Sequence, residues 1–231
     1  PKDWLFSNYI RTFRELSAGG KNIFVMFGNS LWLSVLPPTI NLFTAAMASY
    51  AMAHYKFPGR GLIWAIMIFM MTLPIMGNSA AVYKMYLRLG MYNSPLIFLR
   101  NITGLGGSLM LIAAFTGISK TYAEAAFLDG AGHFRTFISV MLPQAASVIA
   151  SLGIVAFIST WNDYMNPILF LESYPTMSMG LYVYQQETLQ QGIDIPVLFA
   201  GVIMSTVPVL TLFVIFQNSI MSLTLGGGLK G

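Results

Sequence analysis

The sequence predicts an all-α protein of membrane-spanning helices, and three observations carry this prediction. Apolar residues make up 56% of the 231 residues and charged residues 9%, against about 45–50% and about 25% in soluble domains. The mean hydropathy is +0.68. Apolar stretches of roughly 20 residues or more recur along the chain, the length with which an α-helix crosses about 30 Å of hydrocarbon. We therefore expect a helical bundle in a lipid bilayer.

The elements follow one another in a simple order. Residues 1–26 form an amphipathic start, and residues 223–231 form a C-terminal tail. Between them lies the membrane domain, residues 27–222, for which we expect five transmembrane helices. These predicted spans are residues 27–53, 61–83, 95–117, 143–170 and 196–222. Because five is an odd number, the two chain ends should lie on opposite sides of the membrane.

A polar loop, residues 119–143, separates the third and fourth predicted spans. Thr121 and Glu124 within it have the spacing of a capping box, which predicts that a short helix begins at Thr121. Gly130 can adopt the left-handed conformation that closes a helix. The loop therefore predicts a helix of about two turns before the chain bends and restarts toward Pro143.

The outer face of this short helix suits a protein partner. Ala125 and Ala126 form a smooth side that another backbone can approach, and Glu124 and Asp129 offer charged hydrogen-bond acceptors. We interpret the element as a docking helix. The candidate docking residues are Thr121, Tyr122, Glu124, Ala125, Ala126, Leu128, Asp129 and Gly130.

The same loop resembles the signature of ABC-importer permeases, which reads Glu-Ala-Ala, three residues, Gly, nine residues, Ile, any residue, Leu-Pro. The matching residues are Glu124, Ala125, Ala126, Gly130, Val140, Leu142 and Pro143. Val140 replaces the usual isoleucine, which is a conservative apolar change. The Asp129-Gly130-Ala131 and Trp161-Asn162-Asp163 tracts and the glycine-rich end look like the carbohydrate branch, in particular the second, smaller permease of importers of the maltose type.

This resemblance implies a fold, a set of partners and a location. The fold would be the helical bundle of type I ABC-importer permeases. The implied partners are a second permease as the other half of a heterodimer, a dimer of ATPase subunits that carry ATP and Mg, and an extracytoplasmic sugar-binding protein. The location would be the bacterial cytoplasmic (inner) membrane, in which the chain passes several times and the loop at residues 119–143 faces the cytoplasm.

The resemblance also implies features at both chain ends. A further helix would precede Pro1, so we expect that the sequence lacks the first helix of the family and that residues 1–26 face outward. The glycine-rich tail would reach into the ATPase dimer, with contacts from Gly226, Gly227, Gly228 and Lys230.

The positive charges favour the reverse orientation by number alone. The expected cytoplasmic side holds Lys56, Arg60, Lys120, Arg135 and Lys230. The expected outer side holds Lys2, Arg11, Arg14, Lys21, Lys84, Arg88 and Arg100. The positive-inside rule weighs short loops and usually the first helix. We therefore give the loop signature precedence over the count.

The fourth predicted span contains a polar tract, Trp161 to Pro167. Asp163 facing lipid would be expensive, so we expect it to face the bundle interior or a water-filled path. Asn162 and Asn166 would share one helical face, and Trp161 together with Tyr164 supplies aromatic surface that can stack on sugar rings. One interpretation is a translocation path through Trp161, Asn162, Asp163 and Asn166. The alternative is that Asp163 and Asn166 satisfy backbone groups freed by the proline, while the aromatic residues form an interfacial belt.

A second polar segment, residues 171–196, precedes the last predicted span, and we expect it to be an outward-facing loop. Its residues Tyr174, Tyr182 and Tyr184 could form a docking surface for the soluble binding protein that the resemblance implies. The alternative is a solvated amphipathic connector.

Other kinds of chemistry find little support in the sequence. It contains no GxxxxGK[ST] motif, so we do not expect this chain to hydrolyse ATP by itself. With 2 histidines and 0 cysteines, we predict no metal site, no bound cofactor and no catalytic residue. The 12 Lys and Arg are spread along the chain, which argues against nucleic acid as a partner.

These inferences lead to one expected function and two rivals. The chain would be a permease subunit of an ATP-driven importer for an oligosaccharide or related sugar, in which ATP hydrolysis by separate subunits drives alternating access. The nearer rival is a permease of the same architecture for a polyol, glycerol phosphate or peptide. The more distant rival is a membrane scaffold or intramembrane enzyme that uses Asp163 without transport.

Overall fold

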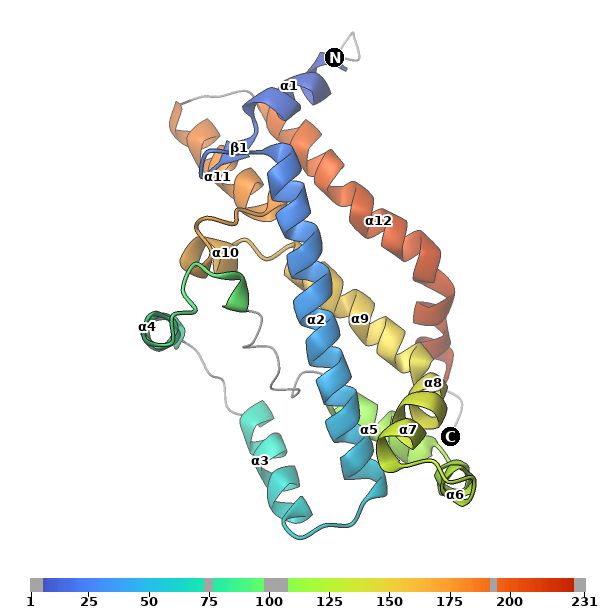
Figure 1. Ribbon diagram of the computed structural model, residues 1–231. Coiled ribbons are helices and arrows are strands. Elements are labelled where there is room, and N and C mark those ends of the chain that lie inside the picture. The colour runs from blue at the N-terminus through green and yellow to red at the C-terminus, as the bar shows by residue number, and fades with distance from the viewer. Residues whose placement is uncertain (1–5, 73–76, 98–107, 192–194, 227–231) are drawn as a thin grey trace. The chain divides into compact units, whose positions relative to one another are not determined.

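The computed structural model describes four stretches of the chain, residues 6–72, 77–97, 108–191 and 195–226. In these stretches the chain is helical apart from turns and one short hairpin (Figure 1). The predicted all-α class is therefore confirmed.

The chain divides into two compact units. Unit 1 comprises Pro1–Pro37, Ser79–Leu99 and Ala156–Ile215. Unit 2 comprises Pro38–Asn78, Arg100–Val155 and Phe216–Gly231. Three long helices contribute residues to both units, namely α2 (Ile23–His54), α9 (Ala146–Trp161) and α12 (Ile195–Gly226).

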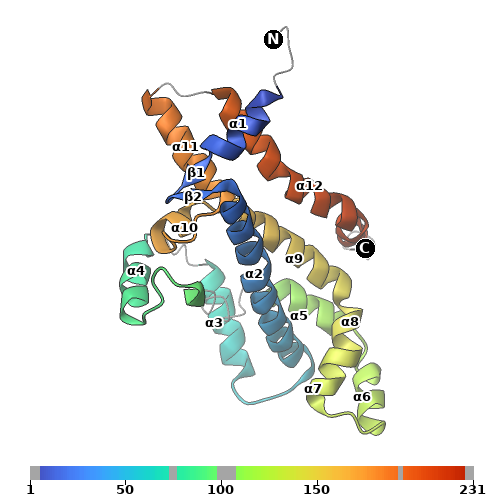
Figure 2. The same cartoon turned by 45° about the horizontal axis from the view of Figure 1, so that its top comes forward.

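Unit 1 holds the beginning of the chain and the elements that follow α9. Its further helices are α1 (Ser7–Glu15), α4 (Ser79–Arg88), α10 (Met165–Phe170) and α11 (Met177–Gln191). Strands β1 (Ser17–Ala18) and β2 (Lys21–Asn22) pair antiparallel between α1 and α2 (Figure 2).

The turn of this hairpin explains the Gly-Gly sequence at its tip. Gly19 has φ +56° and Gly20 has φ +70°, as a type I′ turn requires at both central positions. The pairing of Ala18 with Lys21 follows from this turn. Ala18 is buried and packs with α11, in a core cluster that includes Leu16, Ile23, Met26, Met177, Tyr184 and Val197.

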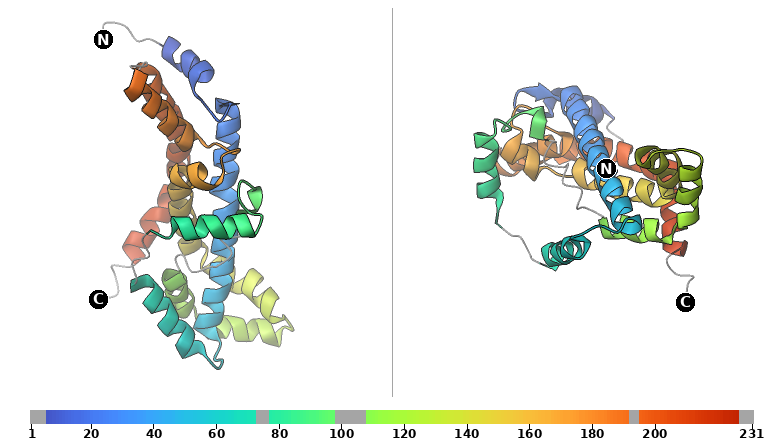
Figure 3. Two further views of the ribbon diagram at one scale, coloured as in Figure 1. Left: turned by 90° about the vertical axis from the view of Figure 1, so that its left-hand side faces the viewer. Right: turned by 60° about the horizontal axis from the view of Figure 1, so that its bottom comes forward.

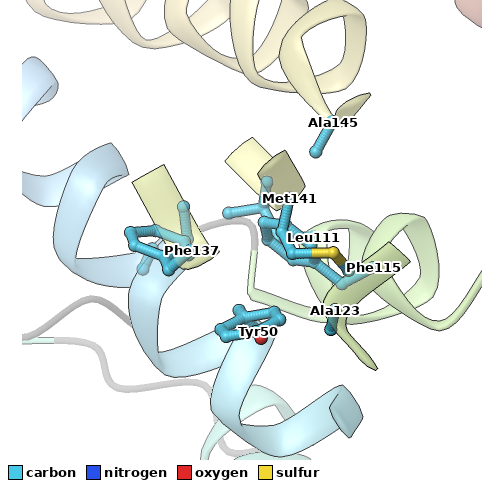
Figure 4. Close-up of a cluster of buried hydrophobic side chains, with 9 residues drawn as sticks. Tyr50, Leu111, Phe115, Ala123, Phe137, Met141 and Ala145 are labelled. Carbon is cyan, nitrogen blue, oxygen red and sulfur yellow. The ribbon is translucent and has the colours of Figure 1, made fainter. Parts of the chain in front are cut away.

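Unit 2 holds the end of α2 and the polar loop. Its further helices are α3 (Arg60–Thr72), α5 (Ser108–Gly117), α6 (Lys120–Leu128), α7 (His133–Thr136), the π-helix η2 (Phe137–Met141) and α8 (Leu142–Gln144). Figure 4 shows its main buried cluster, formed by Ala45, Ala46, Tyr50, Leu111, Phe115, Ala123, Phe137, Met141 and Ala145.

Among the described residues, two helices are long and apolar enough to cross a membrane by themselves. These are α2 and, over Ile195–Gln217, α12. They confirm the first and fifth predicted spans. The segment His133–Gln144 together with α9 passes the same test as a pair, but the two parts meet at a bend of 79°. The described part of the chain thus holds two spans, or three if the bent pair counts as one.

The three middle spans differ from the prediction. No single helix covers 61–83, because α3 ends at Thr72 and α4 begins only at Ser79. Gly77 has φ +74° just before α4, a left-handed backbone that interrupts a helix. In the third predicted span α5 covers Ser108–Gly117, and residues 98–107 lie outside the described residues. In the fourth predicted span, residues 143–170, the continuous helix α9 ends at Trp161.

Candidate functional site

The short helix α6 begins one residue before the predicted start, and a different residue caps it. Ser119 is the N-cap, with extended backbone (φ −60°, ψ 136°), and its hydroxyl accepts the backbone N–H of Thr121 at 3.3 Å. Thr121 lies in the first turn, so the predicted capping box of Thr121 and Glu124 is wrong. Two hydroxyl residues lie close together here, and the one that precedes the helix takes the cap because its backbone is extended.

The C-terminal end of α6 forms a Schellman motif around Gly130, as predicted. Gly130 has φ +80°. Its N–H donates to the Phe127 carbonyl at 3.0 Å, and the N–H of Ala131 donates to the Ala126 carbonyl at 2.9 Å. These two bonds satisfy carbonyls that would otherwise lack partners at the helix end.

One side of α6 is buried and the other is exposed. Ala123 and Ala126 are buried, at 6% and 8% exposure. Ala126 therefore belongs to the packed side, which corrects its assignment to the docking face. Leu128 is 90% exposed and Tyr122 54% exposed. The other exposed candidates are Thr121, Glu124, Ala125, Asp129 and Gly130.

The buried side of α6 packs against a cluster of apolar side chains from α5 and η2. Ala123 packs in the cluster with Phe115 of α5 and with Phe137 and Met141 of η2 (Figure 4). The N–H of Leu142 donates to the Phe137 carbonyl, the five-residue spacing of a π-turn. Pro143 follows directly; its ring and missing N–H disfavour a regular α-turn onto the carbonyl four residues earlier, and a wider turn avoids this conflict.

A histidine–tyrosine pair joins the loop after α6 to the end of α2. His133 begins α7, and its Nδ1 lies 2.8 Å from the hydroxyl of Tyr55. Phe127 of α6 packs edge-on against the His133 ring, with centroids 4.9 Å apart. The hydroxyls of Tyr55 and Tyr50 lie 3.5 Å apart. Tyr50, Tyr55 and His133 border a hollow of about 450 Å³. Together with the contact between Phe127 and His133, these side chains link α6 and α7 to the end of α2.

The tract at residues 161–167 is arranged differently from both the helix and the path that we predicted. Trp161 is 1% exposed, stacks on Phe157 and donates its indole N–H to the Ser205 carbonyl at 3.0 Å. The Trp161 ring therefore offers almost no exposed surface on which a sugar could stack. Because α9 ends at Trp161 and α10 begins at Met165, Asn162 and Asn166 do not share one helical face.

Asp163 serves the backbone around Pro167. Its carboxylate accepts the backbone N–H of Asn166 at 3.0 Å and also the side-chain amide of Asn166. Proline has no N–H to donate to the carbonyl four residues earlier, which is that of Asp163. The hydroxyl of Ser178 donates to this carbonyl at 2.8 Å. This arrangement agrees with the alternative in part: Asp163 pairs a backbone group, the N–H of Asn166, but the carbonyl freed by the proline is paired by Ser178 and not by Asp163 or Asn166.

A cavity of about 760 Å³ opens in unit 1 beside this tract. Tyr164 and Tyr182 stack at its wall, with ring centroids 4.5 Å apart and planes 16° apart. The polar lining residues are Asn162, Tyr164, Ser178, Tyr182, Gln185, Gln186, Ser205 and Thr206. The apolar lining residues are Leu181, Leu198, Phe199, Val202 and Val209.

The sequence reasoning missed the contribution of α11 to this cavity. We expected residues 171–196 to be a loop, but Met177–Gln191 is a helix. The available signal was the spacing of Ser178, Tyr182 and Gln185 or Gln186, which places polar residues on one helical face. The predicted tyrosine docking surface is also wrong in part, because Tyr184 is 4% exposed and packs in the core of unit 1.

The structure says less about the predicted tail contact and the predicted absence of a metal site. The tail residues Gly227, Gly228 and Lys230 lie outside the described residues, and Gly226 is the last residue of α12. Within the described part of the chain, no three His, Asp or Glu side chains gather as a metal site.

Comparison with known proteins agrees with this picture of a membrane protein. Residues 40–221 match the family described as binding-protein-dependent transport system inner membrane component. The chain therefore belongs to this family, whose members are non-catalytic permease components of ABC transporters. The expected class of protein and its place among membrane components are confirmed.

Two relatives and one solved structure are particularly similar. The diacetylchitobiose uptake system permease protein NgcG of Streptomyces coelicolor is 29% identical over 95% of this chain and 72% of its own length. The arabinooligosaccharides transport system permease protein AraQ of Halalkalibacterium halodurans is 25% identical over 100% and 81%. A chain of a bacterial ABC transporter that imports the acidic polysaccharide alginate has the same fold, with a TM-score of 0.77, 22% identity, and coverage of 94% of this chain and 80% of that one.

Proposed function

We propose that this chain is one permease subunit of an ATP-driven importer for an oligosaccharide or related sugar. Separate ATPase subunits would bind ATP and Mg²⁺, a second permease would complete the pathway, and an external binding protein would deliver the solute. Membership of the family and the names of the relatives support this assignment. The observation that carries it is α6, a short helix closed at both ends by local hydrogen bonds, in which the side chains of Tyr122 and Leu128 are exposed.

The outer face of α6 is suited to a groove on an ATPase subunit. Burying an exposed leucine is worth about 1.5–3 kcal/mol, and Leu128 is 90% exposed in the chain alone. Glu124 and Asp129 lie on the exposed side of the same helix and can accept charged hydrogen bonds at the rim of such a groove. A helix with satisfied ends can dock without first becoming ordered.

Movement of α6 would pass into unit 2 through its packed side. Ala123 lies against η2 and α5, and Phe127 contacts the His133 ring that is bound to Tyr55. Protein interiors are close-packed, so a shift of α6 has to move these neighbours with it. ATP can drive such a shift only if its bound and free states differ in their contact energy with α6.

The solute path in this proposal uses the cavity of unit 1 and no longer Trp161 or Asp163. Amide side chains such as Asn162, Gln185 and Gln186 carry both donors and acceptors, as sugar hydroxyls require. The Tyr164 and Tyr182 rings add aromatic surface. A volume of about 760 Å³ lies within the range of about 300–1,000 Å³ usual for small-molecule sites.

The C-terminal contact stays part of the proposal. Gly226, Gly227, Gly228 and Lys230 would enter the ATPase dimer, where residues with little side chain suit a narrow crevice. Deletion of residues 227–231 should then lower ATPase stimulation while the chain still inserts.

The docking proposal is tested by changing Leu128 in the assembled transporter in proteoliposomes. Leu128→Asp should lower solute-stimulated ATP hydrolysis about tenfold or more, because a charge would enter an apolar groove. Leu128→Met is the matched control, since it keeps the size and apolar character of the side chain. Wild-type stimulation in the Asp variant, with normal insertion, would show that α6 does not dock an ATPase.

The solute class is tested by uptake of labelled oligosaccharides, a polyol, glycerol phosphate and a peptide. We expect sugar uptake. Tyr182→Ala should raise the half-saturation concentration for the sugar, whereas Tyr182→Phe should leave it near normal because phenylalanine keeps the stacked ring. Uptake of only a non-sugar solute would replace the sugar proposal and leave the docking proposal intact.

A further inference from the structure

Helix α1 exposes a row of large apolar side chains. Phe6, Ile10 and Phe13 are 70%, 60% and 41% exposed. Their spacing of four and three residues places them on one face of α1, the blue helix next to the N label in the left view of Figure 3. Arg11 and Glu15 form an ion pair at 2.9 Å, and the helical spacing places both of them on a different side of α1 from this row.

A third side of α1 is fixed to the protein. Thr12 is fully buried, and its hydroxyl lies 3.2 Å from the Val197 carbonyl in the first turn of α12. Leu16, directly after α1, packs in the core cluster with Ile23 and Val197. The exposed row is therefore held in place and does not belong to a loosely attached helix.

These contacts place α1 at the level where two spans begin. Both α2, which starts at Ile23, and α12, which starts at Ile195, are long and apolar enough to cross a membrane. The helix contacts the first turn of each. Where both helices cross the bilayer, a segment that packs against their starting turns would lie near the boundary between hydrocarbon and headgroups.

The exposed row also continues onto α2. The ring of Phe13 stacks on that of Phe24, with centroids 5.4 Å apart. Phe24 is 69% exposed, and Leu31 and Val35 follow it at 39% and 51% exposure. The spacing of seven and four residues keeps these three on one face of α2. The apolar face of α1 is thus continuous with the outer surface of a span.

We propose that α1 is an interfacial helix that binds the bilayer surface. Its apolar row would enter the boundary between headgroups and acyl chains, and Arg11 and Arg14 would face the headgroups. Large apolar residues on one face and arginines on another are the composition of helices that lie in this plane. The lipid is the favoured occupant because the row runs without interruption into the outer face of α2.

Depth-dependent quenching tests this proposal. The chain has 0 cysteines, so Ile10→Cys introduces one labelling site into it, and Ser7→Cys, on a polar side of the same helix, is the control. Each variant is purified with the subunits that accompany it, labelled with a fluorophore, and reconstituted in phosphatidylcholine–phosphatidylglycerol vesicles. The unmutated complex, treated in the same way, supplies the background from cysteines in other subunits.

The outcomes separate the possible occupants. Nitroxides near the acyl-chain carbonyls should quench the label at position 10 several-fold more than the label at position 7, and aqueous iodide should do the reverse. Iodide quenching of both labels to the same extent would place the row in water and overturn the proposal. Protection of position 10 from lipid nitroxides and iodide alike would also overturn it, because a protein would then cover the row.

Discussion

The loop around α6 and the tract at residues 161–167 both interrupt apolar sequence with polar residues, but they use these residues in opposite ways. In the loop, Ser119 and Gly130 close the helix ends, which leaves Glu124 and Asp129 available to a partner. In the tract, the Asp163 carboxylate and the Ser178 hydroxyl are spent on backbone groups around Pro167.

This difference teaches how to interpret polar residues in a membrane protein. Buried backbone groups must be paired, so a polar side chain beside a proline or a helix break is first needed to hydrogen-bond the backbone groups that lack a partner. It becomes available for a ligand or partner only when the backbone is satisfied without it. By this criterion the glutamines of α11 are better ligand candidates than Asp163, and also better than Asn162, whose side-chain amide donates to the Ile158 carbonyl at 2.9 Å.

The largest effect is expected from removing the Trp161 side chain. Replacing a buried tryptophan by alanine costs about 3–5 kcal/mol, so Trp161→Ala should lower the midpoint of thermal unfolding in detergent strongly. Leu128→Ala, at the most exposed position of α6, should change the free energy of unfolding by less than about 0.5 kcal/mol. A stable Trp161→Ala chain with altered solute preference would instead restore Trp161 to the solute path.

The second test concerns the two glycines of the loop. Gly130 has φ +80° and Gly132 has φ −73°. A left-handed backbone costs a non-glycine residue about 1–2 kcal/mol, and a β-branched residue fits it worst. Gly130→Val should therefore reduce ATPase stimulation by roughly tenfold, since about 1.4 kcal/mol is a factor of ten. Gly132→Val should change it little, and equal losses in both variants would refute this account of the loop.

The role of Asp163 as a cap can be separated from a role in transport. Loss of a capping side chain costs about 0.5–2 kcal/mol, so Asp163→Ala should unfold at a lower temperature. Asp163→Asn should recover most of the difference, because its amide oxygen can still accept the N–H of Asn166. If the Ala and Asn variants are equally stable and both fail to transport, the charge itself acts on the solute.

The smallest expected effect is at the link between α2 and α7. Tyr55→Phe removes the hydrogen bond to His133, which is worth about 0.5–1.5 kcal/mol. We expect faster amide hydrogen exchange in α6 and α7 and more ATP hydrolysed per solute transported. Phe134→Leu, which changes an exposed ring in the same helix without touching this bond, is the control. Unchanged exchange in Tyr55→Phe would show that packing alone holds α6.

The order of the elements was largely accessible from sequence, for reasons visible in particular residues. Long runs of apolar residues predicted α2 and α12, because such runs stay helical across a membrane. The end of α6 was accessible because Gly130 suits the left-handed conformation. The N-cap was predicted at the wrong residue because Ser119 and Thr121 both carry a hydroxyl. Spacing alone does not show which of the two has an extended backbone.

The cavity and the anchoring of α1 were beyond sequence reasoning. The side chains that line the cavity come from the stretch between α9 and α10, from α11 and from α12. Nothing in the local pattern of any one segment brings them together. The amphipathic character of α1 was visible, but the burial of Thr12 against Val197 depends on a contact between residues far apart in the chain.

Composition, apolar length and glycine conformation act locally, so the sequence alone was enough to predict the class of this protein, its two long apolar helices and the position of the loop around α6. Only the tertiary structure decided which side of α6 is exposed, that Trp161 and Asp163 support the fold, and that tyrosines and glutamines share a cavity. The physical reason is that burial and hydrogen-bond satisfaction depend on which distant groups a side chain meets.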